Sequence, residues 1–304
     1  MSAMVLYWSL GGTTKRVAEA IAQGLRGAGV GCELHDLRTG APADLATHEI
    51  VGVGFPVHYY RPAIPAADAI RALGRLDGHS VFAFCLHGTD RGAGLNRARA
   101  ALVRAGGTEI GAFACRGDDV FYPYVRSGWR FSPGHPDTDD LENARAFGAS
   151  LPKAHTVAQR HGVVSSLPRR DPRTHPVYAL ERIATHPALV RWFYHDLFRA
   201  DPARCTRCGK CARDCPARAI AWKRGGLPAW GPECVLCLNC AMTCPESAVD
   251  CPLDWVVFRP FISWNVRRAV RDPALDRERV ELRRGRIVST DAPEDASPTE
   301  EGYR

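Results

Sequence analysis

Two stretches of the sequence repeat one cysteine pattern: residues 205–216 read CTRCGKCARDCP, and residues 234–245 read CVLCLNCAMTCP. Both follow C-x2-C-x2-C-x3-C-P, so each run holds four cysteines and ends in a Cys-Pro pair. Of the 12 cysteines, nine fall between Cys205 and Cys251, while Cys32, Cys85 and Cys115 are scattered through apolar runs of the first half. The pattern predicts a small cluster- or metal-binding domain in the second half of the chain.

The spacing within each run is that of ligands to a 4Fe-4S cluster. Three cysteines of one tight loop wrap around one cluster, whereas the fourth, at the start of a helix, ligates the other cluster. Zinc is the alternative, but a zinc site usually combines two separated C-x2-C pairs, and two identical four-cysteine runs fit it poorly. We therefore expect cluster I on Cys205, Cys208, Cys211 and Cys244, and cluster II on Cys234, Cys237, Cys240 and Cys215.

These roughly 50 residues resemble the bacterial two-cluster ferredoxins, with cysteine at all eight ligand positions. The resemblance implies a small α+β ferredoxin-like domain over residues 201–252. Cys251 is the ninth cysteine of this region, and we interpret it as a free thiol near the domain edge.

The composition of the 304 residues limits the class of protein. The chain has 40 Lys+Arg and 33 Asp+Glu, a net charge of +7, and 45% of its residues are hydrophobic. These values exclude a disordered chain, a fibre and a small disulfide scaffold, and the length predicts about two domains. No apolar run approaches the length of a transmembrane segment, and the first residues lack a signal-peptide pattern. We expect a soluble, cytoplasmic protein. Because no run of basic residues occurs, we expect no nucleic-acid partner.

Residues 1–158 alternate between strand and helix patterns. Amphipathic helical patterns separate most of the short apolar runs. Five such strands with intervening helices predict an α/β fold, a doubly wound parallel sheet. The predicted strands are 4–8, 31–37, 50–55, 81–86 and 110–115, and the predicted helices are 14–26, 66–76, 94–105 and 139–158.

A glycine- and hydroxyl-rich turn, SLGGTTK at residues 9–15, follows the first predicted strand and runs straight into a helix. Backbone N–H groups at a helix N-terminus form an anion site, and the helix dipole favours phosphate there. The turn resembles the phosphate loop of flavodoxins, although Gly11 replaces one hydroxyl residue of that pattern. The resemblance implies FMN as a cofactor, its phosphate bound by Ser9, Gly11, Gly12, Thr13 and Thr14.

Two further loops resemble the flavin-binding loops of flavodoxins, which embrace the isoalloxazine ring at the carboxyl ends of the strands. The loop after the third strand contributes Pro56, Val57, His58, Tyr59 and Tyr60, and the loop after the fourth contributes His87 and Gly88. The resemblance implies that Tyr59 or Tyr60 stacks on the flavin. The alternative is a surface loop packed on its own helix.

The remaining segments are a proline-rich linker at residues 159–200, which ends in an aromatic packing helix over 189–198, and a C-terminal extension at 253–304 with a disordered end. In the extension we expect an aromatic stretch (255–264), followed by a strand-like pair. The whole order resembles the EFR1-type flavodoxin–ferredoxin fusion proteins. The segment Pro228–Gly231, read PAWG, also fits that family.

Three functions remain open. The first is an electron-transfer protein that links FMN and two 4Fe-4S clusters to a redox protein partner or a small-molecule electron acceptor. The second is a flavin-dependent reductase of a small substrate, with Arg61, Arg91, Arg116 and Trp129 near the flavin. The third is a ferredoxin whose flavodoxin-like half lacks FMN and serves as a docking module. No catalytic residue is predicted, and the oligomeric state stays open.

Overall fold

The computed structural model describes residues 1–162 and 176–290. The chain forms two compact units, and each is described by itself. Unit 1 comprises residues 1–118 and 134–178, and unit 2 comprises residues 119–133 and 179–304, its described part ending at residue 290. The segment 119–133 therefore leaves the first half of the chain to join the second unit. This division differs from the predicted boundary at residue 158.

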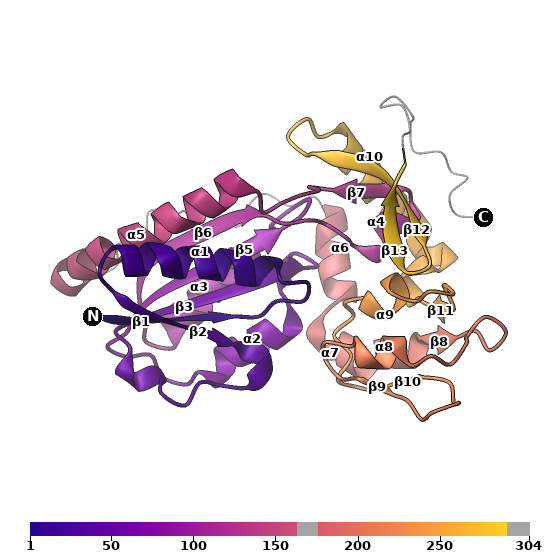
Figure 1. Ribbon diagram of the computed structural model, residues 1–304, viewed down its shortest axis with the longest axis horizontal. Helices are drawn as coiled ribbons and strands as arrows, with labels where there is room; N and C mark the ends of the chain where they lie inside the picture. Colours follow the sequence, from indigo (N-terminus) through magenta and orange to yellow (C-terminus); the bar gives the residue numbers. More distant parts are fainter. Residues whose placement is uncertain (163–175, 291–304) are drawn as a thin grey trace. The chain divides into compact units, whose positions relative to one another are not determined.

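Unit 1 is built on a parallel sheet of the order β2-β1-β3-β5-β6 (Figure 1). This order confirms the predicted doubly wound sheet, with a switch point between β1 and β3. A two-residue strand, β4 (Arg61–Pro62), pairs antiparallel with the end of β3. The parallel strands are β1 (Ser2–Tyr7), β2 (Gly31–Asp36), β3 (Ile50–His58), β5 (Ser80–His87) and β6 (Thr108–Arg116).

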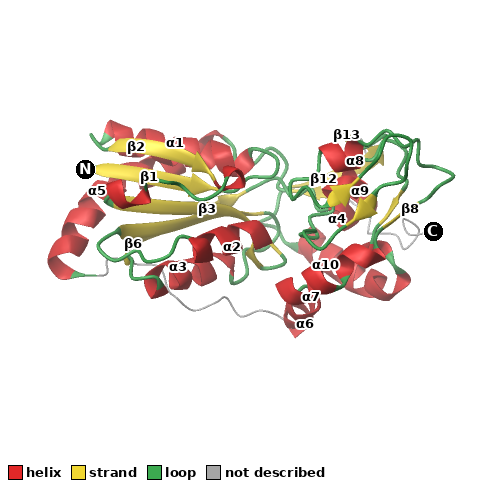
Figure 2. Cartoon of the chain, turned by 90° about the horizontal axis from the view of Figure 1, so that it is seen from below, coloured by secondary structure: helices red, strands yellow, loops and turns green. Residues whose placement is uncertain are grey.

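Helices cover both faces of this sheet (Figure 2). In β1, Ala3 and Val5 face a core shared with α1 (Thr13–Gly27) and α5 (Thr138–His161). The alternate residues Met4 and Leu6 face a second core, shared with α2 (Ile64–Ala72) and α3 (Gly94–Arg104). Because both faces are covered, these strands are continuous apolar runs rather than alternating ones.

Helices α1 and α5 approach each other through two glycines. A Cβ atom at Gly24 would lie 2.0 Å from the Arg145 carbonyl oxygen, and one at Gly148 would lie 2.1 Å from the Ile21 carbonyl oxygen. Any side chain at either position would force the helices apart. The two glycines therefore allow α5 to pack closely against α1 on this face of the sheet.

The cysteine-rich part of unit 2 is an internal repeat of short elements (Figure 1). Helix α8 (Lys210–Arg213) lies within the first cysteine run, and α9 (Asn239–Met242) occupies the equivalent place in the second. Strand β9 (Ile220–Ala221) pairs with β10 (Ala229–Trp230), and β11 (Val249–Asp250) pairs with β8 (Arg199–Ala200). The strand that precedes each cysteine run thus pairs with the strand that follows the other run.

The rest of unit 2 combines segments far apart in the sequence. Strand β7 (Trp129–Phe131) pairs with β12 (Arg277–Arg283), which pairs with β13 (Arg286–Ser289). Helix α4 (Tyr122–Arg126) and helix α10 (Arg259–Arg271) share a hydrophobic core with β7. The predicted strand pair of the extension is confirmed, and the aromatic stretch becomes a 3-10 turn (Val256–Phe258) followed by α10.

The segment that precedes the cysteine runs also differs from prediction. The predicted packing helix over 189–198 is a short helix, α7 (Pro187–Trp192), followed by a 3-10 turn (Tyr194–Leu197), and α6 (Pro176–Ala184) precedes it. Residues 163–175 of the proline-rich linker and residues 291–304 of the predicted disordered end lie outside the described residues. Across residues 1–162 and 176–290, no helix has both the length and the apolar character needed to cross a bilayer.

Candidate functional site: a phosphate loop and two cysteine-lined cavities

The turn after β1 has the backbone of an anion site. Gly12 is the N-cap of α1 with φ of +89°, a left-handed conformation that favours glycine, and its N–H donates to Ser9 Oγ at 3.0 Å. Thr14 is fully buried, and its Oγ1 has no hydrogen-bond partner among the described residues. An unpaired buried hydroxyl lowers the stability of the fold by about 1–3 kcal/mol, so a hydrogen bond from this hydroxyl to a ligand would be favourable. A phosphate oxygen at the helix N-terminus would accept such a hydrogen bond.

Open space lies on one side of this turn. A Cβ atom at Gly11 or at Gly12 would meet no heavy atom within 4 Å. The first turn of α1 contains no acidic residue that would repel a phosphate. The loss of a hydroxyl at Gly11 therefore leaves the site open rather than filled.

The three predicted loops gather at the carboxyl edge of the sheet. The Trp8 N–H donates to the Gly54 carbonyl at 2.9 Å, which holds the phosphate loop beside the end of β3. Pro56 lies opposite Leu86 in the register of β3 and β5, so Val57–Tyr60 and His87–Gly88 emerge side by side. The structure thus brings together the residues that the sequence assigned to the phosphate and to the flavin ring.

Tyr59 and Tyr60 form a tight turn between β3 and β4, with φ of +51° and +62°. Two successive left-handed residues match the two-residue hairpin turn that usually contains Asn-Gly, but a Tyr-Tyr pair carries no such turn signal. Tyr60 is buried, with its ring centroid 4.3 Å from that of Tyr178. Tyr60 is therefore occupied by protein contacts, and half-buried Tyr59 is the better candidate for stacking on a flavin.

The two histidines of these loops are held neutral by their surroundings. Burial lowers the pKa of His58 to about 4, and its ring meets the Trp8 ring edge-on with centroids 5.9 Å apart. Burial also lowers the pKa of His87. Neutral imidazoles add no positive charge beside a bound ring system.

The first cavity of unit 2 is lined by Cys205, Cys208 and Cys211 of the first run and by Cys244 of the second. The second cavity is lined by Cys234, Cys237 and Cys240 of the second run and by Cys215 of the first. Each group of four thiols is therefore the crossed set that the x3 spacing predicts. We name these spaces cavity I and cavity II.

The backbone around both cavities turns its N–H groups toward sulfur. The Ala219 N–H donates to Cys215 Sγ and the Ala248 N–H donates to Cys244 Sγ, both at 3.3 Å. Left-handed residues recur at matching positions of the two runs, with φ of +55° at Arg207 and +54° at Leu236. Such turns build anion-binding concavities, which suit a cluster held by thiolates.

Each cavity is also lined by one tryptophan whose indole N–H is buried. Trp222 lines cavity I and Trp230 lines cavity II. The Nε1 atoms of both are buried; that of Trp230 lies against the Cys240 thiol, and that of Trp222 has no hydrogen-bond partner within the described parts of the chain. A buried donor that faces four thiols fits a site that holds sulfur acceptors.

Burial raises the pKa of the Cys234 thiol to about 11 and that of Cys237 to about 12. It also raises the pKa of Cys211 and, more strongly, that of Cys240. Thiols in such surroundings stay protonated until a metal displaces the proton, so assembly of the site couples to proton release.

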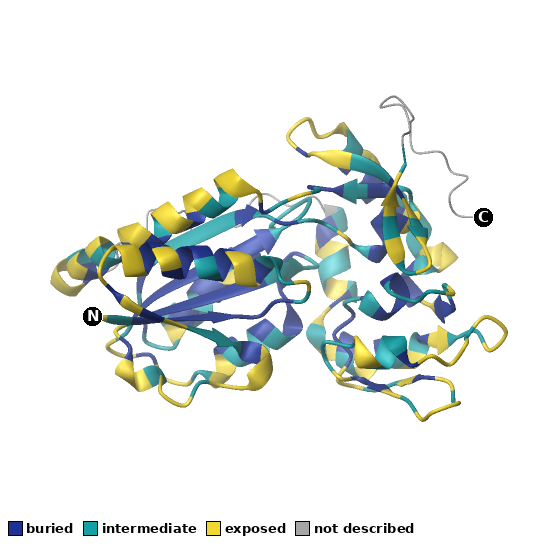
Figure 3. Ribbon diagram, in the orientation of Figure 1, coloured by how far each residue is buried: buried dark blue, intermediate teal, exposed yellow. Residues whose placement is uncertain are grey.

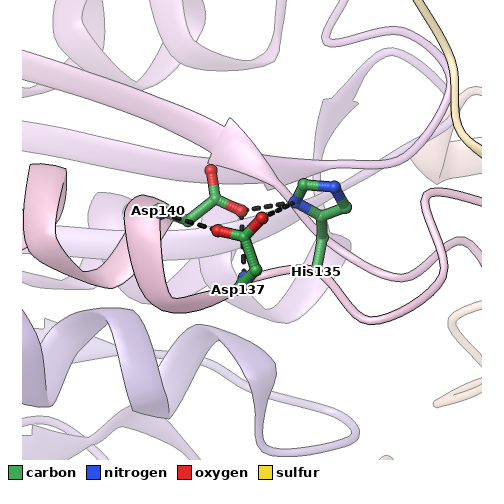
Figure 4. A group of neighbouring side chains, drawn as sticks. All are labelled: His135, Asp137 and Asp140. Carbon is green, nitrogen blue, oxygen red and sulfur yellow. Dashed lines mark hydrogen bonds and ion pairs between the residues drawn. The ribbon is translucent and has the colours of Figure 1, made fainter.

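Another ligand-like group proves to be a helix cap (Figure 4). The Asp137 carboxylate accepts from the Asp140 N–H at 2.9 Å, and the Asp140 carboxylate accepts from the Asp137 N–H at 3.1 Å and also contacts His135. This reciprocal pair is a capping box at the start of α5. The group is accounted for by the helix that it starts.

Two residues named in the sequence analysis lie elsewhere. Trp129 is buried in the core of unit 2, with Arg279 4.3 Å from its ring centroid, whereas Arg61, Arg91 and Arg116 belong to unit 1. Trp129 therefore does not join those arginines within one unit. Cys251 is fully buried and lines neither cavity.

Comparison with known proteins agrees with this geometry. A flavodoxin domain family matches residues 4–131, and a 4Fe-4S binding domain family matches residues 197–220. No curated protein matches the chain. The chain thus combines a flavodoxin domain and a 4Fe-4S binding domain, consistent with a flavodoxin–ferredoxin fusion.

Similar solved structures cover the first half of the chain. A flavodoxin from the domain Archaea is 21% identical over 51% of this chain and 99% of its own, with a TM-score of 0.41. A flavodoxin of Streptococcus pneumonia TIGR4 is 16% identical over 50% of this chain and 99% of its own, with a TM-score of 0.40. Rubredoxin oxygen:oxidoreductase of Desulfovibrio gigas is 17% identical over 52% of this chain and 37% of its own, with a TM-score of 0.41.

Proposed function

We propose that this protein transfers electrons between FMN, bound in unit 1, and two 4Fe-4S clusters, bound in cavities I and II. When bound, a cluster exchanges one electron and FMN exchanges one or two, so the protein links a one-electron redox partner to two-electron chemistry. The crossed sets of four thiols around two cavities are the observation that carries this proposal. An EFR1-type fusion protein is the family assignment that fits this order of domains.

The ligands proposed for cluster I are Cys205, Cys208, Cys211 and Cys244, and those for cluster II are Cys234, Cys237, Cys240 and Cys215. We propose a cytoplasmic location, because reducing conditions there keep cysteines as thiols that can ligate a cluster.

We propose that FMN is bound with its phosphate at Ser9–Thr14 and its ring between Pro56–Tyr60 and His87–Gly88. The buried, unpaired Thr14 hydroxyl supports this placement and favours it over an FMN-free docking module. The reductase alternative has less support, because Trp129 belongs to the core of unit 2.

Anaerobic purification with iron, sulfide and FMN quantified per chain tests the proposal. We expect about eight irons, about eight sulfides and about one FMN per chain. Iron without flavin would instead favour the docking module, and iron near half that value would leave one cavity without a cluster.

The Thr14→Val variant tests the phosphate site. A hydrogen bond to a charged group is worth about 1.5–3 kcal/mol, so FMN affinity should fall roughly 10- to 100-fold, while iron content stays unchanged. The matched control is Thr156→Val, in which an exposed hydroxyl that donates to the Pro152 carbonyl is lost. Unchanged FMN affinity in Thr14→Val would place the phosphate elsewhere.

A further inference from the structure

The surroundings of cavity I are exposed and basic. Cys208 is exposed, whereas Cys234 and Cys240 of cavity II are buried. Arg207, Lys223 and Arg224 are exposed, and within residues 1–162 and 176–290 none of the three forms an ion pair with a carboxylate. Two neighbouring basic residues are neutralised, since Arg204 pairs with Asp201 at 2.7 Å and Lys210 with Asp214 at 2.6 Å.

Arg207 lies next to the exposed thiol in the chain and in the cavity wall, whereas Lys223 and Arg224 are connected to the same wall through Trp222. Arg207 directly precedes Cys208 and lines cavity I, and Lys223 and Arg224 directly follow Trp222, which lines the same cavity. One acidic residue, Glu246, also lines this cavity. The net charge of the unpaired side chains around the exposed edge of cavity I is therefore positive.

We propose, on the basis of the electron-transfer function above, that Arg207, Lys223 and Arg224 around Cys208 form the docking surface for an acidic one-electron redox protein. Electron-transfer partners form small, transient interfaces, and opposite surface charge steers their encounter. One electron crosses this interface at a time, so that one protein is oxidised as the other is reduced. The apolar second run offers no comparable charge.

Binding tests this surface directly. The probes are an acidic flavodoxin, a basic cytochrome c and a short DNA duplex, titrated calorimetrically into the full-length protein loaded with iron and sulfide. Affinity for the acidic flavodoxin should fall steeply between about 0.01 M and about 0.15 M ionic strength, over which the Debye length shrinks from about 30 Å to about 8 Å. The basic cytochrome should bind weakly at both.

Charge reversal locates the surface. The double variant Arg207→Glu/Arg224→Glu should weaken binding of the acidic flavodoxin at least tenfold at low salt, whereas Arg104→Glu, an exposed arginine of α3, should leave it unchanged. The proposal would be overturned if both variants lost the same affinity for the acidic flavodoxin, or if the parent protein did not bind it. Tighter binding of cytochrome c or DNA than of the flavodoxin would also overturn it.

Iron content separates this test from that of the proposed function. The variants should retain the iron of the parent protein, because none of these arginines is a proposed ligand. If the double variant loses iron, Lys223→Glu carries the test, since Lys223 is not adjacent to a cysteine. A parent protein without iron would contradict the proposed function instead.

A different observation carries a second inference, about the two tryptophans. We propose that the Trp222 indole N–H donates to a sulfur atom in cavity I and the Trp230 indole N–H to one in cavity II. Trp222 is held in place by Gly209, where a Cβ atom would lie 2.9 Å from the ring. Trp230 is stacked on Phe198 with centroids 5.6 Å apart. Both rings are thus fixed with a buried donor in the cavity: the Trp230 indole lies against the Cys240 sulfur, and the Trp222 indole N–H has no acceptor among the described residues.

A hydrogen bond to sulfur stabilises the more negative, reduced state of a cluster and raises its reduction potential. Trp230→Phe keeps the ring but removes the donor, so the reduction equilibrium of one cluster should fall about tenfold, which corresponds to about 59 mV for one electron. Trp222→Phe should shift the other cluster alone. Trp255→Phe, at an exposed tryptophan outside both cavities, is the control.

Redox titration monitored by paramagnetic resonance measures both potentials. The Cys215→Ala variant, which should lack cluster II, shows which potential belongs to which cluster. Two unchanged potentials, or a shift of cluster I in Trp230→Phe, would overturn this inference. Iron content again reports separately on whether the clusters are present.

Discussion

The two cysteine runs share one backbone and differ in nearly everything around it. Arg207 and Leu236 have the same left-handed conformation, as do Gly209 and Leu238. Yet Arg207 is exposed, whereas Leu236 is fully buried. Figure 3 shows the same contrast between the two short helices, since α9 is mostly buried and α8 is half-buried to exposed. Spacing therefore determines where the thiols lie, while the residues between the cysteines determine how much water reaches them.

This difference separates two properties of an iron–sulfur site. Ligand geometry depends on the cysteines and the turns between them, whereas reduction potential and reactivity depend on burial and hydrogen bonding. One repeat thus builds two cavities with the same set of four thiols in unlike surroundings, cavity I with an exposed thiol and cavity II with two buried ones.

The largest effect should come from breaking the crossed ligation. Cys215 belongs to the first run but lines cavity II, so Cys215→Ala should remove cluster II and lower the iron content from about eight to about four per chain. Cys205→Ala should remove cluster I instead. Iron analysis and paramagnetic resonance of the reduced variants distinguish the two.

Cys251→Ala is the control for this comparison, since Cys251 is buried but lines neither cavity. It should keep all its iron. Damage to the same cluster in Cys215→Ala and Cys205→Ala would mean that each run is a self-contained four-ligand site.

The sequence predicts the parts of this molecule that depend on short-range patterns. Alternating strand and helix signals predict the sheet of unit 1, and the x3 spacing predicts which thiols share a cavity. The pairing of β7 with β12 could not be predicted, because a three-residue strand has almost no pattern of its own and its partner lies far along the chain. Nothing in the sequence signals that 119–133 joins unit 2.

The site residues show the same limit. The turn at residues 9–15 is recognisable because its glycines and hydroxyls are contiguous, and phosphate binding there stays a prediction. The tight turn at Tyr59–Tyr60 lacks the Gly or Asn that normally signals left-handed residues, so its geometry was missed. Trp222 was missed as well, because its place in cavity I depends on how β9 folds back over Gly209.

Access of iron chelators should differ between the two cavities. Cys208 is exposed while Cys234 and Cys240 are buried, so a chelator such as bathophenanthroline should release iron in two phases, the faster at least several-fold quicker than the slower. The slow phase should be missing from Cys215→Ala, which should lack the enclosed cluster. A single phase in the parent protein would contradict the contrast in exposure.

Gly209 and Leu238 occupy equivalent positions of the two runs, but the first has no room for a side chain and the second buries one. Gly209→Ala should cost about 1–2 kcal/mol for its left-handed backbone, with φ of +70°, and more because the new Cβ meets Trp222. Leu238→Ala should cost about 2–5 kcal/mol through lost burial. Guanidinium midpoints for loss of the visible iron–sulfur absorption measure both.

Gly225→Ala isolates the backbone part of the first effect. Gly225 has φ of +81°, but a Cβ atom there would meet nothing within 4 Å. The difference between Gly209→Ala and Gly225→Ala is therefore the cost of moving the Trp222 ring. Equal midpoints for the two variants would show that Trp222 does not pack on Gly209.

The smallest effect concerns the link between the two runs. The Asn239 amide, at the start of α9, donates to the Asp214 carbonyl at the end of α8 at 2.9 Å, so the second run caps the helix of the first. The equivalent Lys210 reaches only Asp214 of its own helix, through a half-exposed ion pair. Asn239→Ala should lower the free energy of unfolding by about 1 kcal/mol, because it strips a helix-end carbonyl of its partner. Lys210→Ala should cost less than about 0.5 kcal/mol, since water replaces an exposed pair. If the guanidinium midpoint falls as far in Lys210→Ala as in Asn239→Ala, the contact between the runs adds nothing beyond a local surface interaction.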